Sequence, residues 1–94
     1  MNLFKDTIEE YTESEFLAFL EAMMANPDNL KGRDFGKRVE KFVEHFKKVT
    51  EHPEGSDVIF YPKEGQEDSP KGILKEVKQW RAANGKPGFK REDD

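Results

Sequence analysis

The two histidines, His45 and His52, are the side chains best suited to bind a metal or to move a proton near neutral pH. They lie seven residues apart, whereas a zinc-binding pair on a helix needs a spacing of four. No obvious third ligand lies between them. We therefore expect one histidine on a helix face and one near a helix C-terminus, interacting with the helix dipole or with backbone carbonyls. We predict neither a metal nor a cofactor.

Carboxylates are abundant, but their positions do not suggest catalysis. The pairs Glu9-Glu10 and Glu67-Asp68 lie in polar stretches, whereas acid–base chemistry needs a desolvated or coupled carboxylate in a pocket. The glycine-containing stretch 31–36 lacks the preceding strand and the spacing of a phosphate loop. We therefore predict that the chain is not an enzyme.

The segment Asp57–Pro62 combines an acid with a run of apolar and aromatic residues. A single helical turn cannot bury all of them, so we expect Val58 and Ile59 to face inward and Phe60 and Tyr61 to face partly outward. Exposed aromatic rings beside an acid on a rigid turn are typical of a hot spot in a protein–protein interface. The residues alone thus favour a protein-interaction module.

Four helices must position these residues, and we expect them at about 12–26, 34–50, 57–61 and 70–84. Thr12 and Glu15 form a capping-box pattern at the first helix. Asp34 is the expected N-cap of the second helix, and Ser69-Pro70 opens the last one with an N-cap serine and a first-turn proline. The fold class predicted is all-α: a small, irregular antiparallel four-helix bundle with a very short third helix. We expect the tail 88–94 to be mobile past Phe89.

Composition bounds the class of protein further. The chain has 94 residues, which suits a single domain over 1–94, and it contains no cysteine, which suits a reducing cytoplasm. The longest apolar runs are four or five residues, so we expect no membrane partner, and no signal peptide is visible at the N-terminus. The formal net charge is −4 and the pI about 5.3, which argues against a dedicated nucleic-acid binder.

The charge is distributed in bands along the sequence. Residues 1–25 and 50–70 each carry a net charge of −5, whereas 26–49 and 71–94 each carry +3. The expected second helix has a basic stripe, formed by Lys37, Arg38, Lys41, Lys47 and Lys48. This stripe suggests either contact with nucleic acid or a solvent-exposed helix face with salt bridges to Glu40 and Glu44, and the second interpretation accounts for it at least as well.

Four segments resemble one protein family: YTESEFL at 11–17, TEHPEGSDVIFYPKEG at 50–65, DSP at 68–70 and VKQWRAANGKPGFK at 77–90. They are similar to the immunity proteins of E-type colicins and S-type pyocins, over nearly the whole chain except 26–49. The resemblance implies a cytoplasmic, non-enzymatic inhibitor that forms a 1:1 complex with the HNH-type DNase domain of its cognate bacteriocin. The inhibitor would bind beside the active site, without contacting nucleic acid itself, and can leave the producing cell together with the toxin.

The resemblance also implies which residues bind the toxin. The shared anchor corresponds to Ser56, Asp57, Phe60, Tyr61 and Pro62. The outward-facing positions of the second helix that discriminate between toxins correspond to Gly36, Val39, Glu40, Val43, Glu44 and Lys47. Phe60 stands where the family often has a tyrosine, and Gly36 and Lys47 stand where relatives carry an acid. We therefore expect a partner with a locally different charge pattern.

Two other functions stay open from the sequence. An acidic inhibitor would also suit an RNase-type bacteriocin, and the basic stripe would suit a small nucleic-acid-binding regulator.

Overall fold

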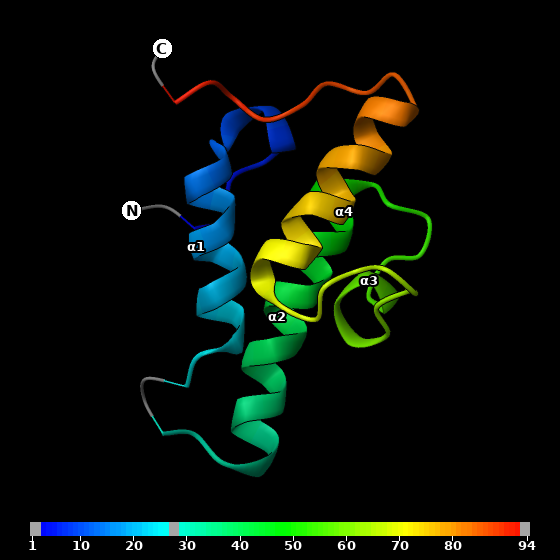
Figure 1. Ribbon diagram of the computed structural model, residues 1–94. Helices are drawn as coiled ribbons and strands as arrows, with labels where there is room; N and C mark the ends of the chain where they lie inside the picture. Colours follow the sequence, from blue (N-terminus) through cyan, green and yellow to red (C-terminus); the bar gives the residue numbers. More distant parts are fainter. Residues whose placement is uncertain (1–2, 27–28, 93–94) are drawn as a thin grey trace.

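The computed structural model describes residues 3–26 and 29–92, and its secondary structure is helical (Figure 1). The elements are a short 3-10 helix η1 (Ile8–Glu10) and the α-helices α1 (Glu13–Met24), α2 (Gly32–Thr50), α3 (Asp57–Phe60) and α4 (Pro70–Ala83). The predicted all-α fold with a very short third helix is confirmed. Within the described ranges, none of the helices is both long and apolar enough to cross a bilayer.

The sequence signals at the starts of α1 and α4 act as predicted. The backbone N–H of Glu15 donates to the Thr12 hydroxyl (3.1 Å), and the N–H of Thr12 donates to the Glu15 carboxylate (2.9 Å). That backbone hydrogen bond, followed by one from the Lys5 ammonium at 2.9 Å, lowers the pKa of Glu15 from 4.5 to about 2. At α4, the Ser69 hydroxyl accepts from the N–H of Gly72 (3.1 Å), with Pro70 in the first turn.

The start of α2 differs from the prediction. The helix begins at Gly32 with Lys31 at the N-cap position, so Asp34 lies within the first turn and is not the cap. Gly32 has a φ of +53°, a left-handed value that glycine adopts without strain, so the chain can turn into the helix two residues earlier than expected. Asp34 still suits its place, because an acid in the first turn interacts favourably with the helix dipole. The end of α1 also differs from the prediction, because this helix stops at Met24, two residues before the predicted residue 26.

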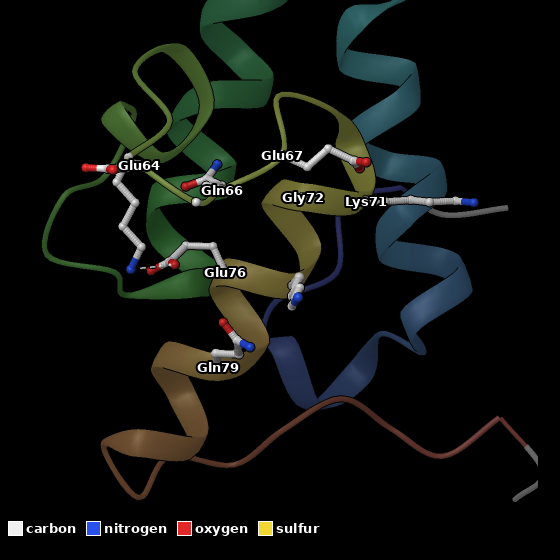
Figure 2. Close-up of a pocket in the computed structure, with 10 residues that line it drawn as sticks. Glu64, Gln66, Glu67, Lys71, Gly72, Glu76 and Gln79 are labelled. Atoms are coloured by element: carbon white, nitrogen blue, oxygen red, sulfur yellow. Dashed lines mark ion pairs between the residues drawn. The ribbon is translucent and has the colours of Figure 1, made fainter.

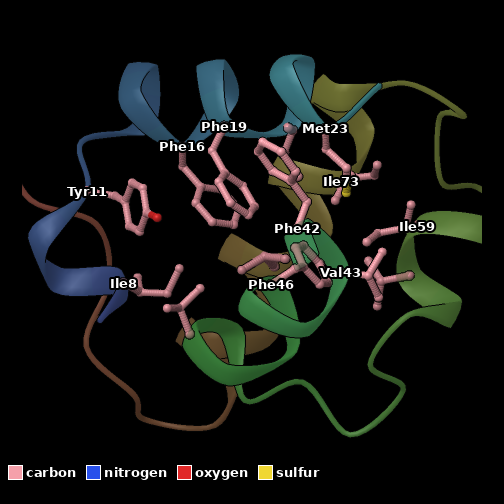
Figure 3. Close-up of a cluster of buried hydrophobic side chains, with 14 residues drawn as sticks. Ile8, Tyr11, Phe16, Phe19, Met23, Phe42, Val43, Phe46, Ile59 and Ile73 are labelled. Atoms are coloured by element: carbon pink, nitrogen blue, oxygen red, sulfur yellow. The ribbon is translucent and has the colours of Figure 1, made fainter. Parts of the chain in front are cut away.

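The hydrophobic core lies where α1 packs against α2 and α4 (Figure 3). Phe16 and Phe19 of α1 lie opposite Phe42 and Phe46 of α2, with centroid distances of 5.3 Å for Phe19–Phe42 and 6.1 Å for Phe16–Phe46. Ile73 and Val77 of α4 complete the core, and α3 adds two aliphatic side chains from the side. Because the apolar residues of each long helix recur every three or four positions, each helix has one face in this core.

The ends of the described chain pack more closely than the sequence suggested. Tyr11 is fully buried, and its hydroxyl donates to the carbonyl of Leu3, which ties the N-terminal segment to η1. The N–H of Lys90 donates to the Tyr11 carbonyl (2.7 Å), and the Phe89 ring lies 5.3 Å from that of Phe16. The C-terminal segment therefore crosses from α4 back to the start of α1 (Figure 1), and it is held by a backbone hydrogen bond one residue beyond the point where we expected mobility to begin. Residues 93–94 of the predicted tail lie outside the described residues.

Candidate partner-binding surface

The one-turn helix α3 presents two aromatic rings to solvent. Val58 and Ile59 are buried in the core, whereas Phe60 is 53% exposed and Tyr61 is 76% exposed. The predicted division of inward and outward side chains is therefore confirmed. In the described ranges, Met24 is the only other exposed large hydrophobic residue, and at 46% it is less exposed than either ring. Since burying two aromatic rings is a large favourable term in association, these rings are the strongest candidates for contact with a partner.

The residues around the rings hold the turn in shape. The carbonyl of Ser56 accepts from the N–H of Phe60 (3.0 Å), and the carbonyl of Asp57 accepts from the N–H of Tyr61 (2.8 Å). The Ser56 side chain makes no capping hydrogen bond, and the Asp57 carboxylate is exposed. Pro62 follows Tyr61 and is partly buried. The five predicted anchor residues thus lie in one short stretch of chain, which we call the anchor segment, 56–62.

The predicted discriminating positions on α2 are not all on its outer face. Gly36, Glu40, Glu44 and Lys47 are exposed, and Val39 is partly buried. Val43 is only 9% exposed and belongs to the core, so its assignment to the outward face is wrong. The reason is helical geometry: Val43 lies four residues after Val39 and three before Phe46, on the same inward stripe.

An apolar groove joins α3 to the first half of α2 and the end of α1. Its walls are contributed by three helices, through Met23, Met24, Phe35, Val39, Ile59 and Phe60. The groove lies directly beside the exposed Phe60 ring, so the apolar surface extends from the anchor segment to α2. Sequence reasoning missed the groove because it depends on how three helices meet.

Acidic side chains surround the anchor segment in sequence and are all accessible. The six acids of 50–70 are exposed, namely Glu51, Glu54, Asp57, Glu64, Glu67 and Asp68. Some of them serve the fold, since Glu51 accepts a hydrogen bond from the buried Arg81 (3.1 Å). The remaining negative charge favours a basic partner and raises its association rate.

The basic stripe of α2 is partly occupied by contacts within the protein. Arg38 donates to the carbonyls of Ala22 (2.8 Å) and Ala25 (3.4 Å) at the end of α1, and its guanidinium lies 4.9 Å from the centre of the Phe42 ring. The Lys41 ammonium lies 5.2 Å from the centre of the Phe4 ring. Arg38 and Lys41, two of the five cations of the stripe, are therefore engaged by side chains or carbonyls of their own chain.

The two histidines have structural roles. The Nε2 atom of His45, on the face of α2, lies 2.7 Å from the carbonyl oxygen of Lys5 in the N-terminal segment. His52 is buried, and its Nε2 lies 3.0 Å from a carboxylate oxygen of Glu76, a side-chain partner that we did not predict. Among the residues that the structure describes, His, Asp and Glu form no group of three that could hold a metal ion.

The fold and this surface together define a small helical domain with an exposed aromatic and acidic patch suited to binding another macromolecule. Residues 8–83 match the family model for colicin immunity protein / pyocin immunity protein. The chain is 52% identical to the pyocin-S1 immunity protein and 51% identical to the pyocin-S2 immunity protein, both of Pseudomonas aeruginosa. Each match covers 92% of this chain and 97% of the relative. The chain therefore belongs to the colicin and pyocin immunity protein family.

Two solved structures show the same fold. One is the crystal structure of the pyocin AP41 DNase–immunity complex, in which the matching chain is 55% identical with a TM-score of 0.82, over 92% of this chain and 98% of that one. The other is the mutant nuclease domain of pyocin S8 with its cognate immunity protein, at 41% identity and a TM-score of 0.75, over 92% of this chain and 99% of that one. These values confirm the resemblance that the sequence motifs indicated.

Proposed function

We propose that this chain binds and inhibits the DNase domain of a cognate bacteriocin as a 1:1 complex, and so protects the DNA of the cell that makes the toxin. The observation that carries the proposal is the anchor segment, where Phe60 and Tyr61 are exposed beside Asp57 on a turn whose other side chains are fixed in the core. Membership of the immunity protein family, and likeness to a chain solved in a pyocin DNase–immunity complex, support it.

The anchor segment would supply most of the affinity. The rings of Phe60 and Tyr61 lose their water on binding, and the carboxylate of Asp57 can accept hydrogen bonds from a cationic side chain of the nuclease. Phe60 lacks the hydroxyl of a tyrosine, so at this position the ring can pack against the partner but cannot make a side-chain hydrogen bond to it. The apolar groove beside Phe60 offers room for a side chain of the partner.

The exposed part of α2 would supply discrimination between toxins. Its exposed positions present a particular pattern of charge and size, namely Gly36, Glu40, Glu44 and Lys47. A non-cognate toxin would bind less tightly, because like charges would repel or polar groups would be left unpaired in the interface. Inhibition would follow because this acidic protein, bound beside the nuclease active site, occupies space that the DNA needs and repels its phosphates. We expect the protein to act in the cytoplasm, as an inhibitor without catalytic activity of its own.

A cleavage assay tests this function directly. The purified chain is titrated into the nuclease domain of the bacteriocin encoded beside it, with plasmid DNA and transfer RNA as parallel substrates. We expect plasmid cleavage to stop at a 1:1 molar ratio while the chain alone cleaves neither substrate. Inhibition of RNA cleavage by a toxin that does not cut DNA would show an RNase-type partner, and undiminished plasmid cleavage at a large excess of the chain would refute the proposal.

A further inference from the structure

Glu76 is a buried carboxylate on α4 that faces the loop between α3 and α4 (Figure 2). Its Oε2 atom lies 3.0 Å from Nε2 of His52, and its Oε1 atom lies 2.8 Å from the ammonium of Lys63. Burial alone would raise the pKa of Glu76, but hydrogen bonds from Lys63 and His52, together with the charge of Lys63, lower it. The carboxylate is therefore ionised at neutral pH, and it is stabilised there because both of its oxygens are paired.

The two partners of Glu76 flank the anchor segment. His52 lies four residues before Ser56, and Lys63 directly follows Pro62. One carboxylate on the long helix α4 thus holds the chain both before and after the short helix α3.

The hydrogen bonds of His52 fix its orientation. Its Nδ1 accepts from the backbone N–H of Glu54 (3.1 Å), so Nε2 must carry the proton that is donated to Glu76. The ring also lies 4.9 Å from that of Trp80, one turn further along α4. Glu76 and Trp80 therefore hold the same histidine from one face of α4.

The helix α3 depends on such external support. A helix of one turn is far below the length at which helices are stable alone, because its nucleation cost is not repaid by further hydrogen bonds. Two aliphatic side chains in the core and a hydrogen bond from Gln66 to the carbonyl of Val58 (2.9 Å) attach its inner side. The residues that flank the segment, His52 and Lys63, are held through Glu76.

We propose that Glu76 is a positioning residue for nuclease binding, which presets the anchor segment in the free protein by holding His52 and Lys63 together. This inference rests on the proposed function of the anchor segment. Loosening the segment lowers the fraction of molecules that are competent to bind, so it slows association. The same loosening leaves the dissociation rate nearly unchanged, since the anchor segment makes the same contacts with the nuclease once it is bound.

The variant Glu76→Gln tests the proposal at nearly constant volume. Both carboxylate oxygens accept hydrogen bonds, so the amide nitrogen of glutamine must face either the ammonium of Lys63 or the N–H of His52, and one hold is lost. Lys63→Met removes the ion pair with Glu76 from an exposed position, so it keeps the test valid if the glutamine variant does not fold. Lys63→Arg retains a cation that can pair with Glu76. The matched control is Glu13→Gln, which removes the 2.9 Å pair with Lys78 between α1 and α4.

Hydrogen exchange on the free protein is the first measurement. In Glu76→Gln and Lys63→Met, we expect exchange at the amides of Phe60 and Tyr61 to accelerate at least about tenfold relative to the amides of α1. Lys63→Arg and Glu13→Gln should leave that ratio unchanged. Equal changes in α1 and α3 would overturn the proposal, because they would show only a loss of global stability.

Stopped-flow binding to the nuclease domain is the second measurement. We expect the association rate constant to fall about two- to fivefold in Glu76→Gln, with the dissociation rate constant within about twofold of the wild type. A change confined to dissociation would overturn the positioning role. If the wild-type chain binds no nuclease domain, the proposed function fails on its own, and the exchange data still decide whether Glu76 holds α3.

Discussion

Truncating Tyr61 to alanine should separate binding from folding, because this ring is the most exposed large hydrophobic side chain in the described ranges. The side chain is 76% exposed in the free protein, so its removal should change the free energy of unfolding by less than about 0.5 kcal/mol. Covering most of an aromatic ring is worth about 1.5–2.5 kcal/mol, and a hydrogen bond from its hydroxyl adds about 0.5–1.5 kcal/mol. We therefore expect Tyr61→Ala to weaken binding by about 2–4 kcal/mol, or about thirty- to nearly a thousandfold in Kd.

The assay combines urea unfolding of the free variant with competition binding to the nuclease domain. Tyr61→Phe is the matched control, because it removes the hydroxyl and keeps the ring, and it should cost only about 0.5–1.5 kcal/mol of binding. Asp57→Ala should cost about 2–4 kcal/mol of binding in the same assay, since it removes the exposed acid of the turn. Unchanged affinity in both Tyr61→Ala and Asp57→Ala would refute the assignment of α3 as the anchor. A parallel loss of folding stability would show that the rings support the core instead.

Four further changes test the fold and its specificity. The pKa of Glu15 is lowered to about 2 in the folded protein, so its stabilising effect is complete above its ordinary value of 4.5 and is lost as the pH falls towards 2. Glu15→Gln should therefore flatten the acid limb of a urea-unfolding series between pH 2 and 6. A Cβ at Gly72 would lie 1.9 Å from the carbonyl oxygen of Glu67, so Gly72→Ala should destabilise the protein by about 1–3 kcal/mol. At Gly36, in the interior of α2, a Cβ would meet no atom within 4 Å, so Gly36→Ala should stabilise the protein by about 0.5–1 kcal/mol. Thermal unfolding of the two variants measures this difference. Exchanging 33–49 for the corresponding segment of a relative should transfer protection to that relative's toxin in a killing assay, and protection that stays with the original toxin would show that α2 does not discriminate.

The parts of the fold that follow local rules were predictable from the sequence. The capping box at Thr12 and the serine–proline start at Ser69 depend only on residues within one turn, and both are present. The outward rings of α3 were predictable for a similar reason, since a single turn cannot bury four side chains. The start of α2 was not, because Gly32 can take a left-handed conformation that no spacing rule indicates.

Contacts between distant segments account for the rest. The hydrogen bond between Lys90 and Tyr11 joins the two ends of the chain, and the pair His52–Glu76 joins a loop to a helix 24 residues away. Neither follows from periodicity. Val43 is the opposite case, because its inward direction does follow from the helix stripe and conflicts with the outward position that the family resemblance implied.

Part of the positive charge of 26–49 is used in contacts within the protein. Arg38 and Lys41 contact α1 carbonyls and aromatic rings of their own chain, so their charge contributes to packing as well as to the surface. Among the exposed α2 positions proposed to meet a toxin, Lys47 is the one cation, and its ammonium lies 3.4 Å from the carboxylate of Glu44. The face that a toxin would meet on α2 is therefore closer to neutral than the sequence band suggests. The acids of 50–70 would then attract a basic nuclease to the surface beside the anchor segment, and α2 would discriminate at short range.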